Sequence, residues 1–354
     1  MNKNKWIAHA RIQPCNKRNL LCFIFDGGSA GYFAPWKYRL FDDINLIPIL
    51  YPAREKRKNE PMHKNMKMFI EDLVTSLAEI FQGDYAFFGY CSGAVLAYEA
   101  ATLASRLYGT QPQYGMVVSS QAPQYLRDTV PVITAENQET LFFNHMMGLP
   151  FMTEKVMHDP VFLNYYKPLF LADYGLLHTY AYHKQNPLAC DLDVIYCPDD
   201  PQVEKEKVVQ WENLTTGATR VIEKDGGHFL VDQQADYIFS VLNGRLSKTQ
   251  ASVQPIKLAP AQGAPNATKT EEKLMKIYHQ VFEQTQFFPS DHFFQKGGDS
   301  LKAVQIVNAV KTEFGIDVNI SDIFRHAQLS DFAAFVAETV DWQVDDSDLE
   351  QGEI

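Results

Sequence analysis

The chain has 354 residues, 46% of them hydrophobic, so it is long enough for two average domains and can bury a substantial core. Its 32 Lys and Arg residues are outnumbered by 43 Asp and Glu residues, and no basic block stands out, which argues against a nucleic-acid-binding protein. The N-terminal residues lack the apolar stretch of a signal peptide, and no apolar run is long enough to span a membrane. We therefore expect a cytoplasmic protein that binds neither nucleic acid nor membranes.

The cysteines are odd in number and show no paired C-x-x-C spacing. They are Cys15, Cys22, Cys91, Cys190 and Cys197. A chain of this length does not need disulfides for stability, so reduced thiols are expected. The sequence shows no cluster of residues with metal-ligand spacing, and we predict no metal site.

Short apolar runs alternate with helical patterns over the first two thirds of the chain. The runs cover residues 19–25, 44–50, 84–90, 114–120, 192–197 and 218–223. Strands that alternate with helices predict a mostly parallel sheet covered by helices on both faces. We expect residues 1–246 to form this α/β domain.

The alternation is interrupted at about residues 124–187, which are rich in Phe, Tyr, Met and His and contain no clear strand. A structureless loop of that length is rare, so we predict a helical insertion that lies over the sheet as a lid. An additional packing subdomain is the alternative. Under either interpretation we expect Met146, Tyr165 and Tyr166 to pack in the protein or to line an acyl pocket, and not to take part in the chemistry.

Residues 247–269 are rich in Pro, Ala, Gln and Ser and lack aromatic residues, which is typical of a flexible linker. The residues that follow, 270–342, predict a small four-helix bundle, because apolar residues recur at three- and four-residue intervals. The clearest helical segments are 271–282, 300–314 and 329–340. The last residues, 343–354, are acidic and are expected to fray.

The segment Gly89-Tyr90-Cys91-Ser92-Gly93 lies between a predicted strand and a predicted helix. Flanking glycines permit the sharp, strained turn of a nucleophile elbow, which exposes the central side chain beside a helix N-terminus. Cys91 is therefore our candidate nucleophile. A buried structural cysteine at an ordinary turn is the alternative.

Two later loops follow predicted strands, where catalytic groups of open α/β sheets collect. One contains Asp199 and Asp200, and the other contains His228 within Gly-Gly-His-Phe. We predict that His228 is the general base and that an aspartate orients its imidazole. Asp199 and Asp200 are both candidates, and we favour Asp200, which directly precedes Pro201.

Four motifs together resemble the type II thioesterases of nonribosomal peptide and polyketide synthesis. They are GGSAGYF at 27–33, FFGYCSGAVLAYEAA at 87–101, DDPQV at 199–203 and GGHFLV at 226–231. The resemblance implies an α/β-hydrolase fold with a helical lid and hydrolysis of acyl groups from carrier-bound phosphopantetheine. It also implies a triad of Cys91, His228 and Asp200.

The resemblance further implies an oxyanion hole built from the backbone N–H of Ser92 and that of Asp26 or Gly27. The chain departs from the family pattern at two positions. Cys91 stands where these enzymes usually have serine, and a serine replaced by cysteine through engineering would leave the same sequence. Asp26 stands where a small apolar residue is usual, and its carboxylate would raise the pKa of the thiol unless it is protonated or points away. A solvated turn residue is the alternative for Asp26.

The sequence DHFFQKGGDSL at 291–301 resembles the attachment motif of peptidyl and acyl carrier domains. The resemblance makes Ser300 the attachment residue for 4′-phosphopantetheine, and it implies a phosphopantetheinyl transferase as a partner. Ser300 begins a predicted helix, whose free amides favour a phosphodiester. A simple helix N-cap is the alternative reading of this motif.

We therefore predict a thioesterase-carrier didomain that works with the modules and carriers of a nonribosomal peptide, polyketide or related pathway, such as antibiotic or siderophore biosynthesis. An acyl-Cys91 thioester would retain the activation of the incoming acyl group, so an acyltransferase between carriers or onto an amine is an alternative. A non-catalytic carrier and docking module is another. The carrier follows the hydrolase domain, which is compatible with editing, loading or transfer.

Overall fold

A computed structural model describes residues 4–7, 18–130, 132–147, 160–247, 267–282, 287–291, 293, 296, 300–318, 322–323 and 326–351. The described residues fall into two compact units. The first lies within Met1–Gln138 and Leu169–Thr249, and the second within Glu139–Pro168 and Gln250–Ile354. Cys15 lies outside the described residues, as does nearly all of the predicted linker at 247–269.

The first unit is built on a six-stranded sheet with the strand order β2-β1-β3-β4-β5-β6, and all neighbouring strands are parallel. The strands are β1 (Arg18–Phe23), β2 (Ile44–Pro48), β3 (Tyr85–Tyr90), β4 (Tyr114–Val118), β5 (Asp191–Tyr196) and β6 (Thr219–Glu223). All six predicted strands are confirmed, with ends that differ by at most two residues. The four inner strands are almost entirely buried, which explains why they read as continuous apolar runs.

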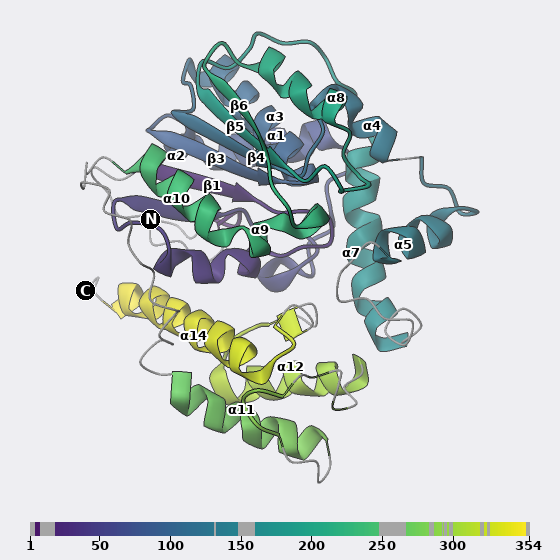
Figure 1. Cartoon of the computed structure of the whole chain (residues 1–354), viewed down its shortest axis with the longest axis vertical. Helices are drawn as coiled ribbons and strands as arrows, with labels where there is room; N and C mark the ends of the chain where they lie inside the picture. Colours follow the sequence, from purple (N-terminus) through teal and green to yellow (C-terminus); the bar gives the residue numbers. More distant parts are fainter. Residues whose placement is uncertain are drawn as a thin grey trace. The chain divides into compact units, whose positions relative to one another are not determined.

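Helices cover both faces of this sheet (Figure 1). Helices α1 (Met66–Ser76) and α3 (Ser92–Tyr108) pack against each other, and α3 packs on β1 and β3. On the other face, the 3₁₀ helix η1 (Ala30–Tyr38) and α10 (Ala235–Leu246) meet through aromatic side chains. The ring of Trp36 lies 4.7 Å from that of Phe88 on the sheet and 5.0 Å from that of Phe239 on α10.

Shorter helical segments connect these elements. They are η2 (Glu55–Arg57), α2 (Ala78–Phe81), η3 (Pro123–Tyr125), α4 (Leu126–Thr129), α8 (Lys205–Val208), η4 (Val209–Leu214), η5 (Gly227–Phe229) and α9 (Leu230–Gln233). The segment predicted to be a lid contains two longer helices, α5 (Gln138–Met147) and α7 (Pro160–His178), and no strand among its described residues. Its position over the sheet stays a prediction.

Of the three residues expected to pack or to line a pocket in this segment, Tyr166 is buried and its ring lies 6.2 Å from that of Phe142. The side chains of Met146 and Tyr165 lie outside the described part of the structure. Tyr166 is therefore a packing residue.

The second unit contains α11 (Ala267–Val281), α12 (Ser300–Phe314) and α14 (Leu329–Gln351), which confirm the three predicted helices of the C-terminal bundle. Leu274 and Tyr278 on α11, Ile306 on α12 and Phe332 on α14 are fully buried and form its core. Among the helices that the structure describes, none is both long and apolar enough to cross a membrane.

The C-terminal tail differs from its prediction. We expected residues 343–354 to fray because they are acidic, but α14 continues through them to Gln351. Neither proline nor glycine interrupts the sequence from Leu329 to Gln351, and Gly352 follows directly. Helix-breaking residues therefore predict the end of this helix better than net charge does.

Candidate active site

Cys91 lies at a strained turn between β3 and α3. It is the N-cap residue of α3, with φ of 54° and ψ of −125°, which a residue with a side chain rarely adopts. Its N–H donates to the carbonyl of Val118 at 2.9 Å, and its own carbonyl accepts from Ala94 at 3.0 Å. Such strain is typical of functional sites, and here it presents the thiol at the carboxyl end of the sheet.

The two flanking glycines permit this turn because no side chain would fit at either position. A Cβ on Gly89 would lie 2.3 Å from the Cα of Ala94, and one on Gly93 would lie 2.5 Å from the carbonyl oxygen of Phe23. Helix α3 can therefore approach both β3 and β1 closely. The close packing of α3 against the two strands therefore requires glycine at both positions of the Gly-x-Cys-x-Gly pattern.

The structure brings His228 and Asp200 together from the loops that follow β6 and β5. The Nδ1 of His228 lies 2.7 Å from Oδ2 of Asp200, whose side chain is fully buried. The other carboxylate oxygen of Asp200 accepts the backbone N–H of Gln202 at 2.9 Å. Asp199 is exposed, so of the two candidate acids only Asp200 is in contact with the imidazole.

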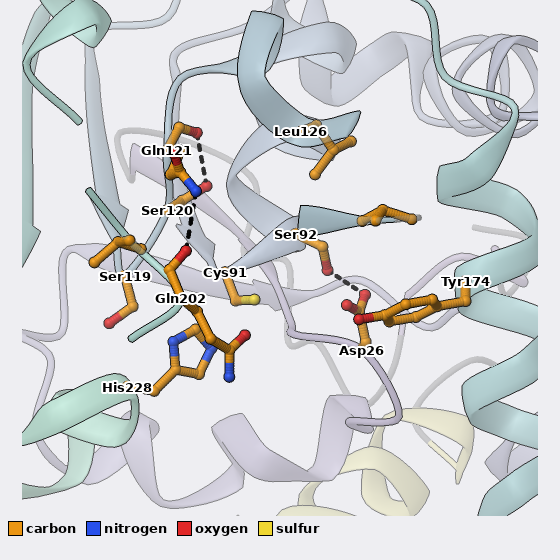
Figure 2. A pocket seen from close by; sticks show the side chains of 12 residues that line it. Asp26, Cys91, Ser92, Ser119, Ser120, Gln121, Leu126, Tyr174, Gln202 and His228 are labelled. Carbon is orange, nitrogen blue, oxygen red and sulfur yellow. Dashed lines mark hydrogen bonds between the residues drawn. The ribbon is translucent and has the colours of Figure 1, made fainter. Parts of the chain in front are cut away.

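Cys91 and His228 line one pocket, together with residues from the loops that follow β1, β4 and β5 (Figure 2). Its other lining residues are Asp26, Ser92, Ser119, Ser120, Gln121, Leu126, Val130, Tyr174, Gln202 and Val203. The hydroxyl of Tyr90 donates to the carbonyl of His228 at 3.0 Å, which anchors the histidine loop to the strand that carries Cys91. The arrangement suits a nucleophile and a base that act on one substrate.

Asp26 is buried in this pocket, and its carboxylate accepts a hydrogen bond from the hydroxyl of Ser92. Burial and the neighbouring Asp173 carboxylate raise the pKa of Asp26 to about 7, although the Ser92 hydroxyl and Arg54 act in the opposite direction. The two alternatives in which Asp26 points away from the nucleophile or is a solvated turn residue are therefore wrong. It is a pocket residue that changes its charge near neutral pH.

One of the two alternatives for the second oxyanion donor is already engaged. The backbone N–H of Gly27 donates to Oδ2 of Asp173 at 2.7 Å. Asp173 also forms an almost fully buried ion pair with Arg54. This pair joins the loop after β2 to α7 and holds the loop after β1, so Gly27 has a structural role.

The Cys91 thiol is neutral in the resting site. Burial raises its pKa well above the usual value, and the charge of Asp26 raises it further, while a hydrogen bond from the Ser92 amide acts in the opposite direction. A base is therefore needed to remove the proton during attack.

Ser300 is the first residue of α12 in the second unit. The amides at the start of this 15-residue helix fit a phosphodiester, because the helix dipole favours a negative charge there. Of the predicted attachment motif, His292, Phe294, Gln295 and residues 297–299 lie outside the described residues. Among the residues that the structure describes, no group of His, Cys, Asp and Glu could hold a metal ion.

Several residues of the site carried no signal in the sequence. Arg54 and Asp173 are 119 positions apart, and neither belongs to a recognisable motif. Ser119, Gln121 and Tyr174 lie in segments that suggested only a strand end and a lid. Only folding brings them to Cys91.

A parallel sheet with a strained nucleophile turn after β3 and an aspartate and a histidine on the loops after β5 and β6 defines an α/β-hydrolase-type site. Comparison with known proteins identifies the class. Residues 18–246 match the model of the thioesterase domain, and residues 273–336 match that of the phosphopantetheine attachment site. The chain belongs to the thioesterase family, and its C-terminal carrier domain bears covalently attached 4′-phosphopantetheine.

Among its relatives is thioesterase PikA5 of Streptomyces venezuelae, which is 25% identical over 248 residues, covering 70% of this chain and 87% of that protein. The gramicidin S biosynthesis protein GrsT of Aneurinibacillus migulanus is 23% identical, covering 64% and 88%. Among solved structures, the RedJ thioesterase from the prodiginine pathway of Streptomyces coelicolor is 27% identical with a TM-score of 0.57, covering 66% and 91%. The type II thioesterase BorB from the borrelidin cluster has the same fold, with a TM-score of 0.60 at 24% identity, covering 70% and 100%.

Proposed function

We propose that the chain cleaves or transfers acyl groups held as thioesters on carrier phosphopantetheine, through a triad of Cys91, His228 and Asp200. The 2.7 Å contact between His228 and Asp200, in the pocket that Cys91 lines, carries this proposal. The relatives include the gramicidin S biosynthesis protein GrsT and a thioesterase of the prodiginine pathway, and they support an assembly line for nonribosomal peptides or polyketides as its setting. The modules of such a line, their carriers and a phosphopantetheinyl transferase are the proposed partners.

The carboxylate of Asp200 accepts a hydrogen bond from the Nδ1–H of His228, so the free electron pair of the imidazole is on Nε2. As the Cys91 sulfur forms a bond to the thioester carbonyl carbon, Nε2 takes the thiol proton. The carbon–sulfur bond to the carrier thiol then breaks, and His228 returns the proton to the departing sulfur. The product is an acyl-Cys91 thioester and a free carrier thiol, and the charge of Asp200 stabilises the imidazolium between the two proton transfers.

The negative oxygen formed during attack needs hydrogen-bond donors. We assign this role to the backbone N–H groups of Ser92, the first residue of α3, and of Asp26. Ser92 is supported by its position beside Cys91 at the helix N-terminus. Asp26 is the remaining choice for the second donor, since the Gly27 amide is bound to Asp173.

We assign the phosphopantetheine attachment to Ser300 at the start of α12. When bound, this group supplies a flexible arm with a terminal thiol that holds the acyl group as a thioester.

Release of the acyl group from Cys91 decides between two outcomes. If His228 activates water, the acyl group leaves as a free acid, which is thioester hydrolysis. A second candidate is acyl transfer, which the cysteine itself favours. An acyl-Cys91 thioester is as activated as the incoming one, so a carrier thiol or an amine can also accept the group.

Intact-protein mass spectrometry of the full-length chain tests both candidates. A phosphopantetheinyl transferase and acyl-CoA would load Ser300, and Ser300→Ala identifies the loaded position. The wild type, Cys91→Ala and His228→Ala are then followed for free acid, acyl-carrier and acyl-Cys91.

Loss of the acyl group as free acid only when Cys91 is present would support hydrolysis. An acyl-Cys91 adduct that persists until a second thiol or an amine is added would support transfer. If Cys91 is never acylated and Cys91→Ala changes nothing, the proposal is wrong and the hydrolase domain serves only for docking.

A further inference from the structure

Asp26 is an unusual neighbour for a cysteine nucleophile. It lies in the same pocket, is 8% exposed, and is near enough for its negative charge to raise the pKa of the Cys91 thiol. An ionised carboxylate there opposes both the thiolate and the oxyanion that forms on attack. A group that neutralises it would remove this penalty.

The Arg54 guanidinium offsets the negative charge of Asp26 only in part. Arg54 is buried and paired with Asp173, so this cluster has two carboxylates and one guanidinium. When both acids are ionised, one negative charge is left in excess. Among the described residues that line the pocket, only His228 can become positively charged, and it is bound to Asp200.

Two further hydrogen-bond acceptors in the pocket are unsatisfied. The side-chain oxygens of Ser119 and Gln121 are buried and have no hydrogen-bond partner in the described structure, although these residues are only 1% and 6% exposed. Buried polar atoms without partners are rare, and each calls for an explanation, such as a water, an ion or a substrate that binds there. In Figure 2 the Ser119 and Gln121 side and the Asp26 side lie on either side of Cys91. The amide oxygen of Gln121 can only accept a hydrogen bond and the Ser119 hydroxyl can accept one, so a ligand with N–H groups would satisfy both.

We propose that Asp26 is a specificity-determining residue that binds the free ammonium group of an aminoacyl thioester. The inference rests on the proposed attack by Cys91. An α-ammonium lies one carbon from the carbonyl that Cys91 attacks, so one substrate can reach both side chains. Its charge neutralises Asp26, and its N–H groups form charge-assisted hydrogen bonds with the carboxylate. Ser119 and Gln121 accept hydrogen bonds from other N–H groups of the bound substrate.

The test compares S-alanyl-pantetheine with S-propionyl-pantetheine, which share a carbon skeleton and differ in the amine. The full-length protein is mixed with each thioester, and the rate of Cys91 acylation per substrate concentration is measured by mass spectrometry. We expect the wild type to prefer the alanyl thioester by about 10- to 100-fold, as for a charged hydrogen bond.

Asp26→Asn is the decisive variant, because asparagine can still accept a hydrogen bond from the Ser92 hydroxyl but carries no charge. We expect it to react more slowly with the alanyl thioester and faster with the propionyl thioester, so that most of the preference is lost. Asp199→Asn, which removes an exposed charge next to the triad, should keep the wild-type ratio. Asp26→Ser serves as a second variant if asparagine disturbs folding.

The outcomes separate the two proposals. If both thioesters acylate wild-type Cys91 equally, or if Asp26→Asn changes both rates by the same factor, the ammonium site is wrong and the role of Cys91 stands. If neither thioester acylates Cys91, the proposed function fails, and the inference that rests on it fails too.

Discussion

Replacing Asp200 with asparagine tests the geometry of the triad directly. Oδ1 of Asp200 accepts the N–H of Gln202 at 2.9 Å, and Oδ2 contacts His228 at 2.7 Å. In Asp200→Asn the amide oxygen must remain with Gln202, which places the amide NH₂ against His228. The Nδ1 atom then has to accept a hydrogen bond, so the proton moves to Nε2, the atom that should receive the Cys91 proton.

The wrong tautomer and the lost negative charge act together. For a comparable change in a serine triad the loss is about 10⁴-fold, and we expect a loss of about 10³- to 10⁴-fold in Cys91 acylation, equivalent to roughly 4–5.5 kcal/mol. Because burial holds the pKa of Cys91 above its usual value, the thiol does not ionise without a base at neutral pH, and the loss should persist there. It should shrink in strongly alkaline solution, where hydroxide removes the proton.

Rapid-quench mass spectrometry of acyl-Cys91 measures this loss, and thermal unfolding checks that the variant is folded. Asp199→Asn is the matched control, since the neighbouring side chain is exposed, and it should stay within about 2-fold of the wild type. A loss of less than about 10-fold for Asp200→Asn, or an equal loss for Asp199→Asn, would refute the assigned triad.

Three further predictions concern stability. Gly93→Ala should lower the melting temperature and destabilise the fold by at least about 1–3 kcal/mol, because its Cβ would lie 2.5 Å from the Phe23 carbonyl oxygen; an unchanged melting temperature would contradict the packing argument. Arg54→Met should cost about 3–5 kcal/mol in urea unfolding, since it leaves Asp173 as a buried charge, whereas Lys58→Met, at an exposed position, should have little effect. The pKa of Asp26 is raised from 3.8 to about 7, so the unfolded chain releases this proton first as the pH rises, and stability falls between pH 4 and 7. Asp26→Asn should remove this decline, so that between pH 4 and 7 its free energy of unfolding rises by roughly 4 kcal/mol relative to that of the wild type. Parallel curves of stability against pH for the two proteins would rule out the raised pKa of Asp26.

Local sequence patterns predicted much of the fold. The strands of a parallel sheet are buried on both faces, so each appears as an apolar run, and the three long C-terminal helices appear as regular apolar repeats. The elbow at Cys91 was also predictable, because its two glycines stand two positions before and two positions after the cysteine, between an apolar run and a helical pattern. The acidic tail was misjudged, since helix α14 continues as far as the residue before a glycine.

The sequence by itself predicted the α/β-hydrolase class, the nucleophile turn and the carrier domain, because each depends on residues adjacent in the chain. It favoured Asp200 over Asp199, but only the structure shows that Asp200 contacts His228 while Asp199 is exposed. Only the tertiary structure decided that Gly27 is bound to Asp173, that Arg54 is paired with the same carboxylate, and that Asp26 faces the pocket. These contacts join loops after different strands to α7. The charged groups in them interact strongly because they are buried. Burial is a property of the folded chain. No local sequence pattern can therefore predict that Asp26, in the same pocket as the Cys91 thiol, has a pKa near neutrality.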